Sequence, residues 1–579
     1  MTILRFLKKT HWLLIGVMAL FISAQVWLDL EIPGYMSRIT VLLNNGSEAD
    51  AILTEGMWMI LCSIGSVCCS IAAGGVAAYV AAEFAKRLRR EQFTKVQSFS
   101  PEEMSRFNIY SLITRSTNDV TQVQLAVART SQLIVKVPVM VYIALTKVAT
   151  GSIEWTEVTA IGITAIVIVQ IFMLCYVIPR YRRVQKYTDG MNRTVREGLT
   201  GARVIRAFNA EDYQNSKADA ANDELTNNNL YAQRLLAFTR PFNGVVQNML
   251  TVAIYVLGAE IILAAASPGD ALETFSNMVV FSSYILYVVS SFILLAHVAM
   301  GLPRAIVSAH RISEVIDTDI SVIGGTESEG TDEDVCISFD NVSFAYPESP
   351  GDTLTGITFD VHRGETVAIT GQTGAGKTSL INLIPRLFDS TSGTVRVDGR
   401  DVREYELASL RSKIGYATQK PILFSGTAAF NIGYGIDDPK DEDMMEAARI
   451  ACIDSFLEEA NGLSTEIQQR GANLSGGQKQ RLSIARAVCK RPEIYIFDDT
   501  FSALDFRTDA QVRRNLKERP EGSTTVIVSQ RIGTIYDADR IIVLSDGKVV
   551  GNGKHADLMA SCEIYREMAE IQEFREAVR

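Results

Sequence analysis

The sequence predicts an all-α domain of six membrane-spanning helices followed by a separate α/β domain. Of the 579 residues, 47% are hydrophobic, yet the long apolar runs fall before Gly301 and a charged, glycine-punctuated sequence follows them. In that second part, a strand-like segment at residues 365–370 runs into a glycine loop and then an apolar helix, the local pattern of an α/β fold with a phosphate-binding loop. Because domains hold about 50–250 residues, a chain of this length needs at least two.

Composition limits the partners of this chain. The formal net charge of -10 argues against nucleic acid, which is bound by clustered Lys and Arg. We therefore expect a membrane and its lipids rather than a nucleic acid. The 8 cysteines have no metal-ligand spacing, so we expect them to be small apolar side chains.

Six apolar segments are long enough to cross a bilayer as helices, which takes about 20 residues. The first could also be a signal peptide, but no small-residue cleavage site follows it, which favours a retained span. The predicted spans are residues 12–43, 57–82, 133–149, 158–178, 245–266 and 278–301.

Charge orients these spans. Residues 44–56, 150–156 and 267–277 contain no Lys or Arg, whereas the other loops are flanked by basic residues. Because basic loops stay on the cytoplasmic side, we expect a multi-pass protein of the bacterial cytoplasmic membrane with both termini in the cytosol. The basic residues are Lys86, Arg87, Arg89, Arg90, Arg180, Arg182, Arg183 and Lys186.

The two inner loops, residues 86–129 and 180–240, have few Gly or Pro breaks and regular apolar spacing, so we expect the helices to continue beyond the membrane. Charged side chains at membrane depth are costly and usually face a polar interior. Snorkelling to the interface is the alternative. Four residues raise this question: Asp29, Glu31, Lys147 and Glu260.

The glycine loop has the full pattern of a phosphate loop, between a buried strand and an apolar helix. Its glycines let backbone N–H groups wrap phosphates at a helix N-terminus. We expect Lys377 to pair with the β- and γ-phosphates and Thr378 to bind Mg²⁺. The nucleotide-binding residues predicted from this loop are Gly371, Thr373, Gly374, Ala375, Gly376, Lys377, Thr378 and Ser379.

Two further motifs follow the phosphate loop. Residues 494–498 form an apolar strand that ends in Asp498, a carboxylate placed to hold Mg²⁺ or its water. Before it lies Leu474-Ser475-Gly476-Gly477-Gln478. With this pentapeptide after a phosphate loop, the sequence resembles the ATP-binding cassette family, and the resemblance covers nearly the whole chain.

The resemblance implies further roles in ATP and Mg²⁺ binding. Tyr346 would stack on adenine, and Gln419 would sense the γ-phosphate and contribute to the metal site. Residues 502–505, ending at Asp505, resemble the loop that links two sites. The pentapeptide, with Ser475, Gly476, Gly477 and Gln478, would bind the γ-phosphate held by another subunit, since its N–H groups open a helix.

The order of the domains resembles the exporter branch of the family. This implies a transmembrane domain of exporter type at residues 1–319, a linker at 320–334 and a nucleotide-binding domain at 335–579. Asn118-Asp119 in the first inner loop and residues 201–209 in the second carry the likeness. Coupling helices that dock on cassettes are expected near residues 107–114 and 193–200.

Three positions depart from the family pattern. Asp499 stands where a hydrolysing cassette has the glutamate that activates water, and Gln530 stands in place of the switch histidine. A carboxylate shorter by one methylene is displaced by about 1 Å, which can cost about 10²-fold in rate. Glutamine cannot carry a proton at neutral pH. Gln469 also replaces a glutamate usual before the pentapeptide.

These departures favour a half-transporter that exports a lipophilic small molecule or lipid as the degenerate-site subunit of a heterodimer. Asp499, Gln530 and Gln419 are its candidate catalytic residues, and Thr378, Gln419 and Asp498 its candidate metal ligands. Three alternatives remain: a homodimeric exporter with slow ATPase, an ATP-gated regulatory subunit, and a siderophore importer.

Overall fold

A computed structural model of the chain describes most of its residues in two compact units. The first unit comprises Met1–Gln97 with Ile109–Thr318, and the second Ser98–Asn108 with Asp319–Arg579. The described residues are 5–6, 8–149, 153–264, 267–331, 334–347, 349–518 and 522–577.

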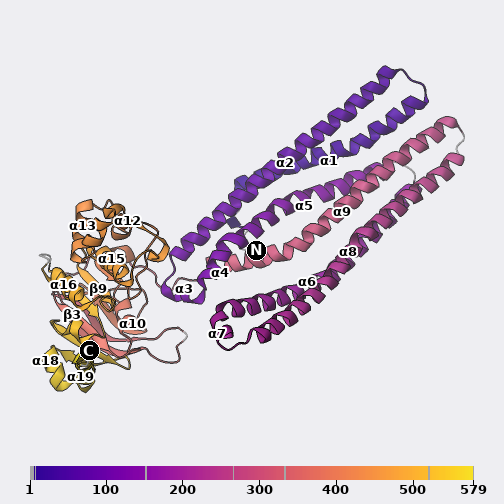
Figure 1. Ribbon diagram of the computed structural model, residues 1–579. Coiled ribbons are helices and arrows are strands. Elements are labelled where there is room, and N and C mark those ends of the chain that lie inside the picture. Colours follow the sequence, from indigo (N-terminus) through magenta and orange to yellow (C-terminus); the bar gives the residue numbers. More distant parts are fainter. Residues whose placement is uncertain are drawn as a thin grey trace. The chain divides into compact units, whose positions relative to one another are not determined.

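The first unit is built from long helices that run side by side in pairs: α1 with α2, α5 with α9, and α6 with α8 (Figure 1). A helix of 49 residues, such as α2, is about 74 Å long, more than twice the hydrocarbon thickness of a bilayer. The helices are α1 (Lys9–Asn44), α2 (Ala49–Gln97), α5 (Val120–Ala149), α6 (Ile153–Thr200), α8 (Glu211–Leu263) and α9 (Pro268–Ile316).

By length and composition, 5 helices in the described part of the chain can cross a membrane. They overlap five of the six predicted spans, of which the span at 245–266 ends in residues 265–266, outside the described part of the chain. The span predicted at residues 158–178 lies in α6, where the described apolar stretch Trp155–Val169 is shorter. The long helices continue into both inner loops, as predicted, and cover most of the second.

Short helices occupy the tips of the two inner loops. In the first, α3 (Pro101–Arg106) precedes α4 (Ile109–Thr114) and a π-helical turn, Arg115–Asp119. In the second, α7 (Ala202–Ala207) separates α6 from α8 (Figure 1). The segment 107–114 therefore coincides with α4, whereas residues 193–200 are the end of α6.

Three of the four charged residues at membrane depth have partners. The Lys147 Nζ lies 2.7 Å from the Glu31 Oε1, which joins α5 to α1, and 6.0 Å from the centre of the Tyr284 ring on α9. Asp29 accepts a hydrogen bond from the Ser66 hydroxyl on α2. The Glu31–Lys147 ion pair shows that these two charges neutralise each other rather than facing lipid alone.

The second unit is an α/β domain of three sheets. Its central sheet has the order β12-β11-β3-β10-β9-β6, in which the five strands from β11 to β6 are parallel. These six strands are β3 (Thr366–Gly371), β6 (Ile414–Ala417), β9 (Ile494–Asp498), β10 (Thr524–Val528), β11 (Arg540–Ser545) and β12 (Lys548–Gly553).

An antiparallel sheet and a short two-stranded sheet complete the domain. The antiparallel order is β2-β1-β4-β5, and β7 pairs with β8. The strands are β1 (Val335–Phe344), β2 (Leu354–His362), β4 (Ser392–Val397), β5 (Arg400–Asp401), β7 (Gly426–Thr427) and β8 (Glu466–Ile467). The strands β9 and β10 are buried at every residue, as expected for a parallel sheet covered on both faces.

Helices surround these sheets. Helix α15 packs beside β6 and α12, and α19 packs on α18. The bounds are α10 (Lys377–Asn382), α11 (Leu407–Ser412), α12 (Ala428–Ile432), α13 (Asp441–Ile450), α14 (Asp454–Glu459), α15 (Gly476–Cys489), α16 (Phe506–Lys517), α17 (Ile532–Ile535), α18 (His555–Ser561) and α19 (Glu563–Ala577).

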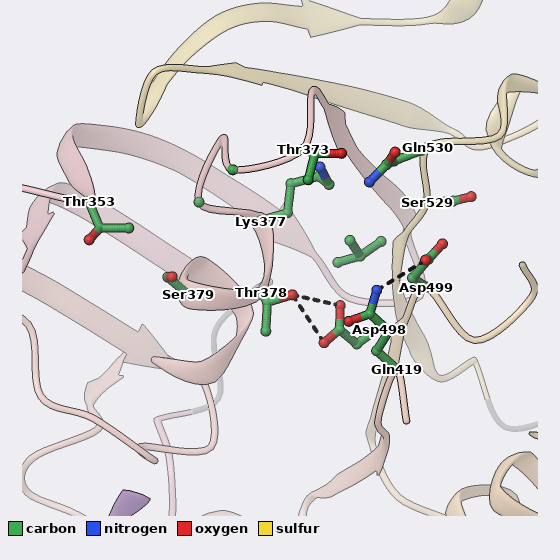
Figure 2. Close-up of a pocket in the computed structure, with 13 residues that line it drawn as sticks. Thr353, Thr373, Lys377, Thr378, Ser379, Gln419, Asp498, Asp499, Ser529 and Gln530 are labelled. Atoms are coloured by element: carbon green, nitrogen blue, oxygen red, sulfur yellow. Dashed lines mark hydrogen bonds between the residues drawn. The ribbon is translucent and has the colours of Figure 1, made fainter. Parts of the chain in front are cut away.

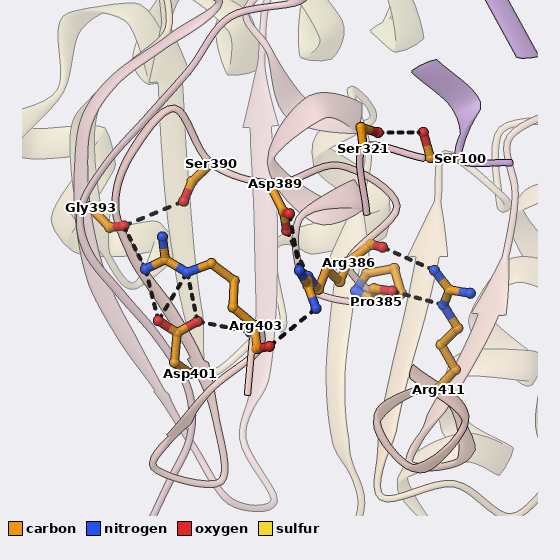
Figure 3. Close-up of polar contacts among 10 residues, drawn as sticks. All are labelled: Ser100, Ser321, Pro385, Arg386, Asp389, Ser390, Gly393, Asp401, Arg403 and Arg411. Carbon is orange, nitrogen blue, oxygen red and sulfur yellow. Dashed lines mark hydrogen bonds and ion pairs between the residues drawn. The ribbon is translucent and has the colours of Figure 1, made fainter. Parts of the chain in front are cut away.

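Segments outside the predicted cassette bounds belong to this unit. The Gly325 N–H donates to Tyr405 O at 2.8 Å, and the Glu406 N–H donates to Glu327 O at 2.7 Å. The residues predicted as a linker thus lie along the edge of the antiparallel sheet. Figure 3 shows Ser100, which precedes α3, hydrogen-bonded to Ser321 at 3.1 Å.

Arginine side chains fix the loops between α10 and α11 (Figure 3). Arg386 pairs with Asp389 at 2.7 Å, and Arg403 with Asp401 at 2.8 Å. Arg411 donates to Arg386 O at 3.0 Å. Such fork-shaped donors satisfy carbonyl and carboxylate oxygens that no strand pairs with.

Candidate nucleotide-binding site

The phosphate loop joins β3 to α10 and depends on glycine for its path. Gly371 has φ 148, and a Cβ at this position would lie 2.1 Å from Leu544 O. Gly376 has φ 92, and a Cβ there would lie 2.7 Å from a methyl group of Leu354. Any other residue would therefore clash and strain the loop.

Lys377 lies inside the curve of this loop. Its Nζ donates to Gly371 O and Gln372 O, each at 2.8 Å. Burial lowers the pKa of Lys377, while the Asp499 and Asp498 charges act in the opposite sense. The ammonium group is thus held where the loop can close around phosphate oxygens.

Thr378 and Asp498, two of the candidate metal ligands, lie within hydrogen-bond distance of each other. The Thr378 hydroxyl lies 3.1 Å and 3.2 Å from the two carboxylate oxygens of Asp498 at the end of β9 (Figure 2). Burial raises the pKa of Asp498, and the hydrogen bond from Thr378 counteracts it. Among the described residues, no group of three His, Cys, Asp or Glu side chains is placed to hold a metal ion.

This donor set fits Mg²⁺, which is usually held by one or two protein oxygens together with phosphates and water. Thr378 and Asp498 would bind it, and Gln419, which lines the same cavity, is the third candidate ligand. When bound, the ion would neutralise charge on the phosphates.

The three candidate catalytic residues lie together. The Gln419 Nε2 donates to the Asp499 Oδ2 at 3.3 Å, and Gln530 lies across the cavity at the end of β10 (Figure 2). Asp499 is half-buried, whereas Gln419 and Gln530 are exposed. Asp499 has φ 47, a left-handed conformation that Asp adopts more readily than most residues.

These side chains line one cavity of about 260 Å³. Of the sequence-predicted residues, it brings together the phosphate loop, the strand carboxylate and the three catalytic candidates. Its lining is Thr353, Thr373, Gly374, Gly376, Lys377, Thr378, Ser379, Gln419, Asp498, Asp499, Val528, Ser529 and Gln530. Three lining residues, Thr353, Val528 and Ser529, were not predicted from the sequence. Ser529 directly follows a buried strand, which was its only signal.

Tyr346 lies next to this cavity rather than in its lining. Its hydroxyl is 2.9 Å from the Ser379 Oγ, and its ring packs edge-on against Phe344 and Phe388. Ala375, another residue predicted to bind the nucleotide, is buried within the phosphate loop. The role of Tyr346 in adenine binding stays a prediction.

The pentapeptide and Asp505 do not line the cavity of their own chain. Ser475 caps α15, since Gln478 N–H donates to the Ser475 Oγ and the Gln478 Oε1 accepts from Ser475 N–H. Ser475 and Gly476 are exposed. Asp505 caps α16 by accepting from Thr508 N–H at 3.0 Å. The α15 N-terminus is thus free to meet a ligand from outside the chain.

A phosphate loop with its strand carboxylate, on a chain that also carries long apolar helices, defines a membrane-bound P-loop ATPase. Models of two families match the chain: the ABC transporter transmembrane region over residues 13–292 and the ABC transporter family over residues 354–502. The chain therefore belongs to the ABC transporter family. It is an ATPase-coupled membrane transporter.

Relatives and a solved structure agree with this assignment. An ABC transporter ATP-binding protein of Mycobacterium tuberculosis is 36% identical over 89% of this chain and 87% of its own. YfiB of Bacillus subtilis is 32% identical over 98% of both chains. An ATP-dependent lipid A-core flippase of Syntrophus aciditrophicus is 33% identical over 67% of this chain and 64% of its own.

The structure resembles a bacterial Atm1-family ABC exporter with ATP bound. The TM-score is 0.81 at 22% identity, with 97% of this chain and 98% of the other covered. This likeness shows that the predicted fold, a helical exporter domain fused to an α/β cassette, is correct.

Proposed function

We propose that this chain is the degenerate-site subunit of a heterodimeric exporter that moves a lipophilic small molecule or lipid out across the cytoplasmic membrane. One observation carries the proposal. The two positions that normally activate water lie in the phosphate-loop cavity but are occupied by Asp499 and Gln530. The neighbouring residues Lys377, Thr378 and Asp498 are of the residue types that nucleotide binding requires, and they make the hydrogen bonds described above.

These substitutions separate ATP binding from ATP hydrolysis. Glutamine can donate a hydrogen bond to a phosphate but cannot hold a proton at neutral pH. The Asp499 carboxylate accepts a hydrogen bond from Gln419 at 3.3 Å. Because the Asp side chain is one methylene shorter than that of Glu, its carboxylate reaches less far toward the attacking water. The site is suited to retaining ATP.

The exposed N-terminus of α15 supports the second half of the proposal. Ser475 and Gly476 would bind the γ-phosphate of the partner's nucleotide, since helix N-terminal N–H groups attract anions. This chain thus contributes to the catalytic site without supplying its glutamate. The partner is a second six-span cassette protein with Glu and His at the corresponding positions.

The substrate class rests on a relative and on the membrane domain. The Syntrophus relative is described as a lipid A-core flippase, which supports a lipid or lipid-like cargo. We place the chain in a bacterial cytoplasmic membrane with both termini in the cytosol, following the distribution of basic loops.

The test compares the purified chain alone with the chain purified together with a candidate partner, a six-span cassette protein that has Glu and His at the two positions. Alone, the chain should bind Mg-ATP but hydrolyse it very slowly; the pair should hydrolyse it briskly. Brisk turnover by a homodimer would overturn the proposal and favour the homodimeric alternative, which Asp499 supports because it is still a carboxylate in the cavity. A pair that hydrolyses ATP without moving lipid or drug would favour the regulatory subunit or the importer.

A further inference from the structure

Two loops that leave neighbouring strands are tied together by one arginine. We call residues 502–505 the bridging loop and residues 529–531 the switch loop. The Arg531 Nη1 donates to Leu504 O at 3.0 Å, and its Nη2 donates to Ser502 O. The guanidinium also lies over the Phe506 ring, 5.6 Å from its centre.

The switch loop is in turn held by the C-terminal helix. The Gln572 Nε2 donates to Gln530 O at 2.7 Å, and the Gln572 Oε1 accepts from Ile532 N–H at 2.8 Å. The two bonds clamp the backbone on both sides of Arg531. A single side chain from α19 therefore fixes the segment that carries Gln530.

Helix α19 is itself firmly anchored. Tyr565 is 0% exposed and Ala569 is 1% exposed. The Tyr565 hydroxyl lies 2.8 Å from the His555 Nδ1 on α18. Gln572 is seven residues after Tyr565 and three after Ala569, so it lies on the same buried face of α19, which makes it a fixed point for the switch loop.

The bridging loop lies beside the first turn of α15, where the exposed pentapeptide is. A Cβ built on Gly477, in the first turn of α15, would lie 3.5 Å from Ala503 O. The Ser502 hydroxyl donates to Asp499 O at 2.7 Å. The bridging loop therefore connects the chain's own cavity, at Asp499, with its exposed pentapeptide.

We propose that Arg531 and Gln572 are positioning residues that form a relay from α19 through the switch loop to the bridging loop and α15. The relay sets the placement of the pentapeptide against the other subunit's nucleotide. It acts on turnover rather than on ATP binding by this chain, because neither side chain lines the cavity.

The relay needs the shape of the arginine as well as its charge. Two separate nitrogen atoms of the planar Arg531 guanidinium donate to two carbonyl oxygens. A lysine ammonium is a single point charge and cannot reproduce both bonds. Loss of the fork frees the bridging loop, and a displacement of about 1 Å in a reacting geometry can cost about 10²-fold in rate.

The experiment uses the full-length dimer in lipid nanodiscs, whether the second subunit is a different chain or a second copy. Arg531→Lys, Arg531→Met and Gln572→Met are compared with Glu570→Gln, an exposed position on the same helix. We expect kcat for ATP hydrolysis to fall about 3- to 30-fold in the first three variants. KM for ATP and labelling of this chain by an azido-ATP probe should stay within about twofold, with Glu570→Gln unchanged.

A double variant, Arg531→Met with Gln572→Met, tests the relay itself. If the residues act in sequence, the double variant falls no further than Arg531→Met alone. Three results would each overturn the proposal: a fall in kcat in the double variant that equals the product of the two single effects, an unchanged kcat in well-folded variants, or a raised KM at constant kcat. Gln572→Met keeps the side-chain length, so the test survives if Arg531→Met does not fold. The outcome does not depend on whether the dimer is a heterodimer, which the previous experiment decides separately.

Discussion

At the scale of single residues, Asp499 shows how the backbone and the chemistry of a site interact. It follows the buried strand β9 and has φ 47, a conformation in which Asp and Asn are several-fold enriched. The sequence identified the residue and its departure from the family pattern. It contained no signal of the left-handed backbone, because that depends on how β9 meets the bridging loop.

A double substitution, Asp499→Glu with Gln530→His, should restore hydrolysis to the chain's own site. Glutamate regains the missing reach, and histidine regains a group that titrates near neutral pH. We expect ATP turnover by the purified chain to rise at least about 10-fold, which steady-state phosphate release measures. The left-handed backbone should lower stability by about 1 kcal/mol for Glu.

The single variants provide the control for this prediction. Asp499→Glu alone should recover part of the gain, and Gln530→His alone less, because a base is needed before a switch residue matters. Turnover that stays at the level of the unmodified chain in the double variant would mean that these two residues are not what limits hydrolysis.

At the scale of elements, the least expected feature is the place of α3. Glu103 is 1% exposed and accepts from Ser100 N–H at 2.7 Å and Ser321 N–H at 2.8 Å. Burial raises the pKa of Glu103, but the hydrogen bonds from Ser100 and Ser321 outweigh it and hold the pKa below its usual range. The carboxylate thus joins the first inner loop to the segment before the cassette.

Replacing Glu103 by Gln should loosen this junction. The amide places an NH₂ group among backbone donors, and leaving a buried donor unsatisfied costs about 1–3 kcal/mol. Hydrogen exchange at the Ser321 amide should become about 5- to 100-fold faster, with exchange in β9 as the internal control. Unchanged exchange at Ser321 would show that the junction does not depend on the charge.

The same contact has a predictable pH dependence. A carboxyl whose pKa is lower in the folded state stabilises that state above its unfolded pKa of about 4.3, and the stabilisation is lost as pH falls through the folded value. Protection at Ser321 should therefore be constant from about pH 6 to pH 8 and decrease only in acid.

The ion pair between Glu31 and Lys147 also acts at the scale of elements, because it joins helix α1 to helix α5. Glu31 and Lys147 have side chains that are 19% and 28% exposed, so each limits the cost of the other. Lys147→Met should leave Glu31 uncompensated and lower the melting temperature of the protein in detergent by several degrees. Glu31→Gln in the same chain should recover most of that loss.

A cavity-facing role predicts something more for this pair. Substrate-stimulated ATPase should change in Lys147→Met while basal ATPase does not, when anionic and neutral lipophilic compounds are compared. If compounds of both classes stimulate the variant as much as the unmodified protein, the pair contributes to helix packing alone.

The parts of the fold that were predictable are those with a local pattern. Apolar runs predicted the long helices, and the strand, glycine loop and helix around Lys377 predicted the nucleotide site. The bonds from Gly325 to Tyr405 and from Arg531 to Leu504 were not predictable, because each ends on a backbone carbonyl of another segment, which no local pattern indicates. The helix of the pentapeptide was recognised, but not its contact with the bridging loop.

At the scale of the whole molecule, the two substitutions that best distinguish the composite sites are Asp499→Asn and Ser475→Arg. Asp499→Asn removes a base that is already too short, so turnover of the heterodimer should fall only modestly, about threefold or less. Ser475 is exposed at the start of α15, where a bulky cation would occupy the position of the partner's γ-phosphate. Losing one such contact costs about 10²–10³ in rate, and exclusion of the phosphate should exceed that.

Steady-state phosphate release at saturating Mg-ATP from both mutant heterodimers measures the contrast. Ser561→Arg makes the same change at an exposed serine of α18 and serves as the matched control, because it adds the same bulk and charge away from α15. The reverse order of effects, with Asp499→Asn inactive and Ser475→Arg active, would mean that the chain's own phosphate loop is the one that turns over. In that case the pentapeptide of this chain serves the retaining site, because each composite site draws its phosphate loop and its pentapeptide from different subunits.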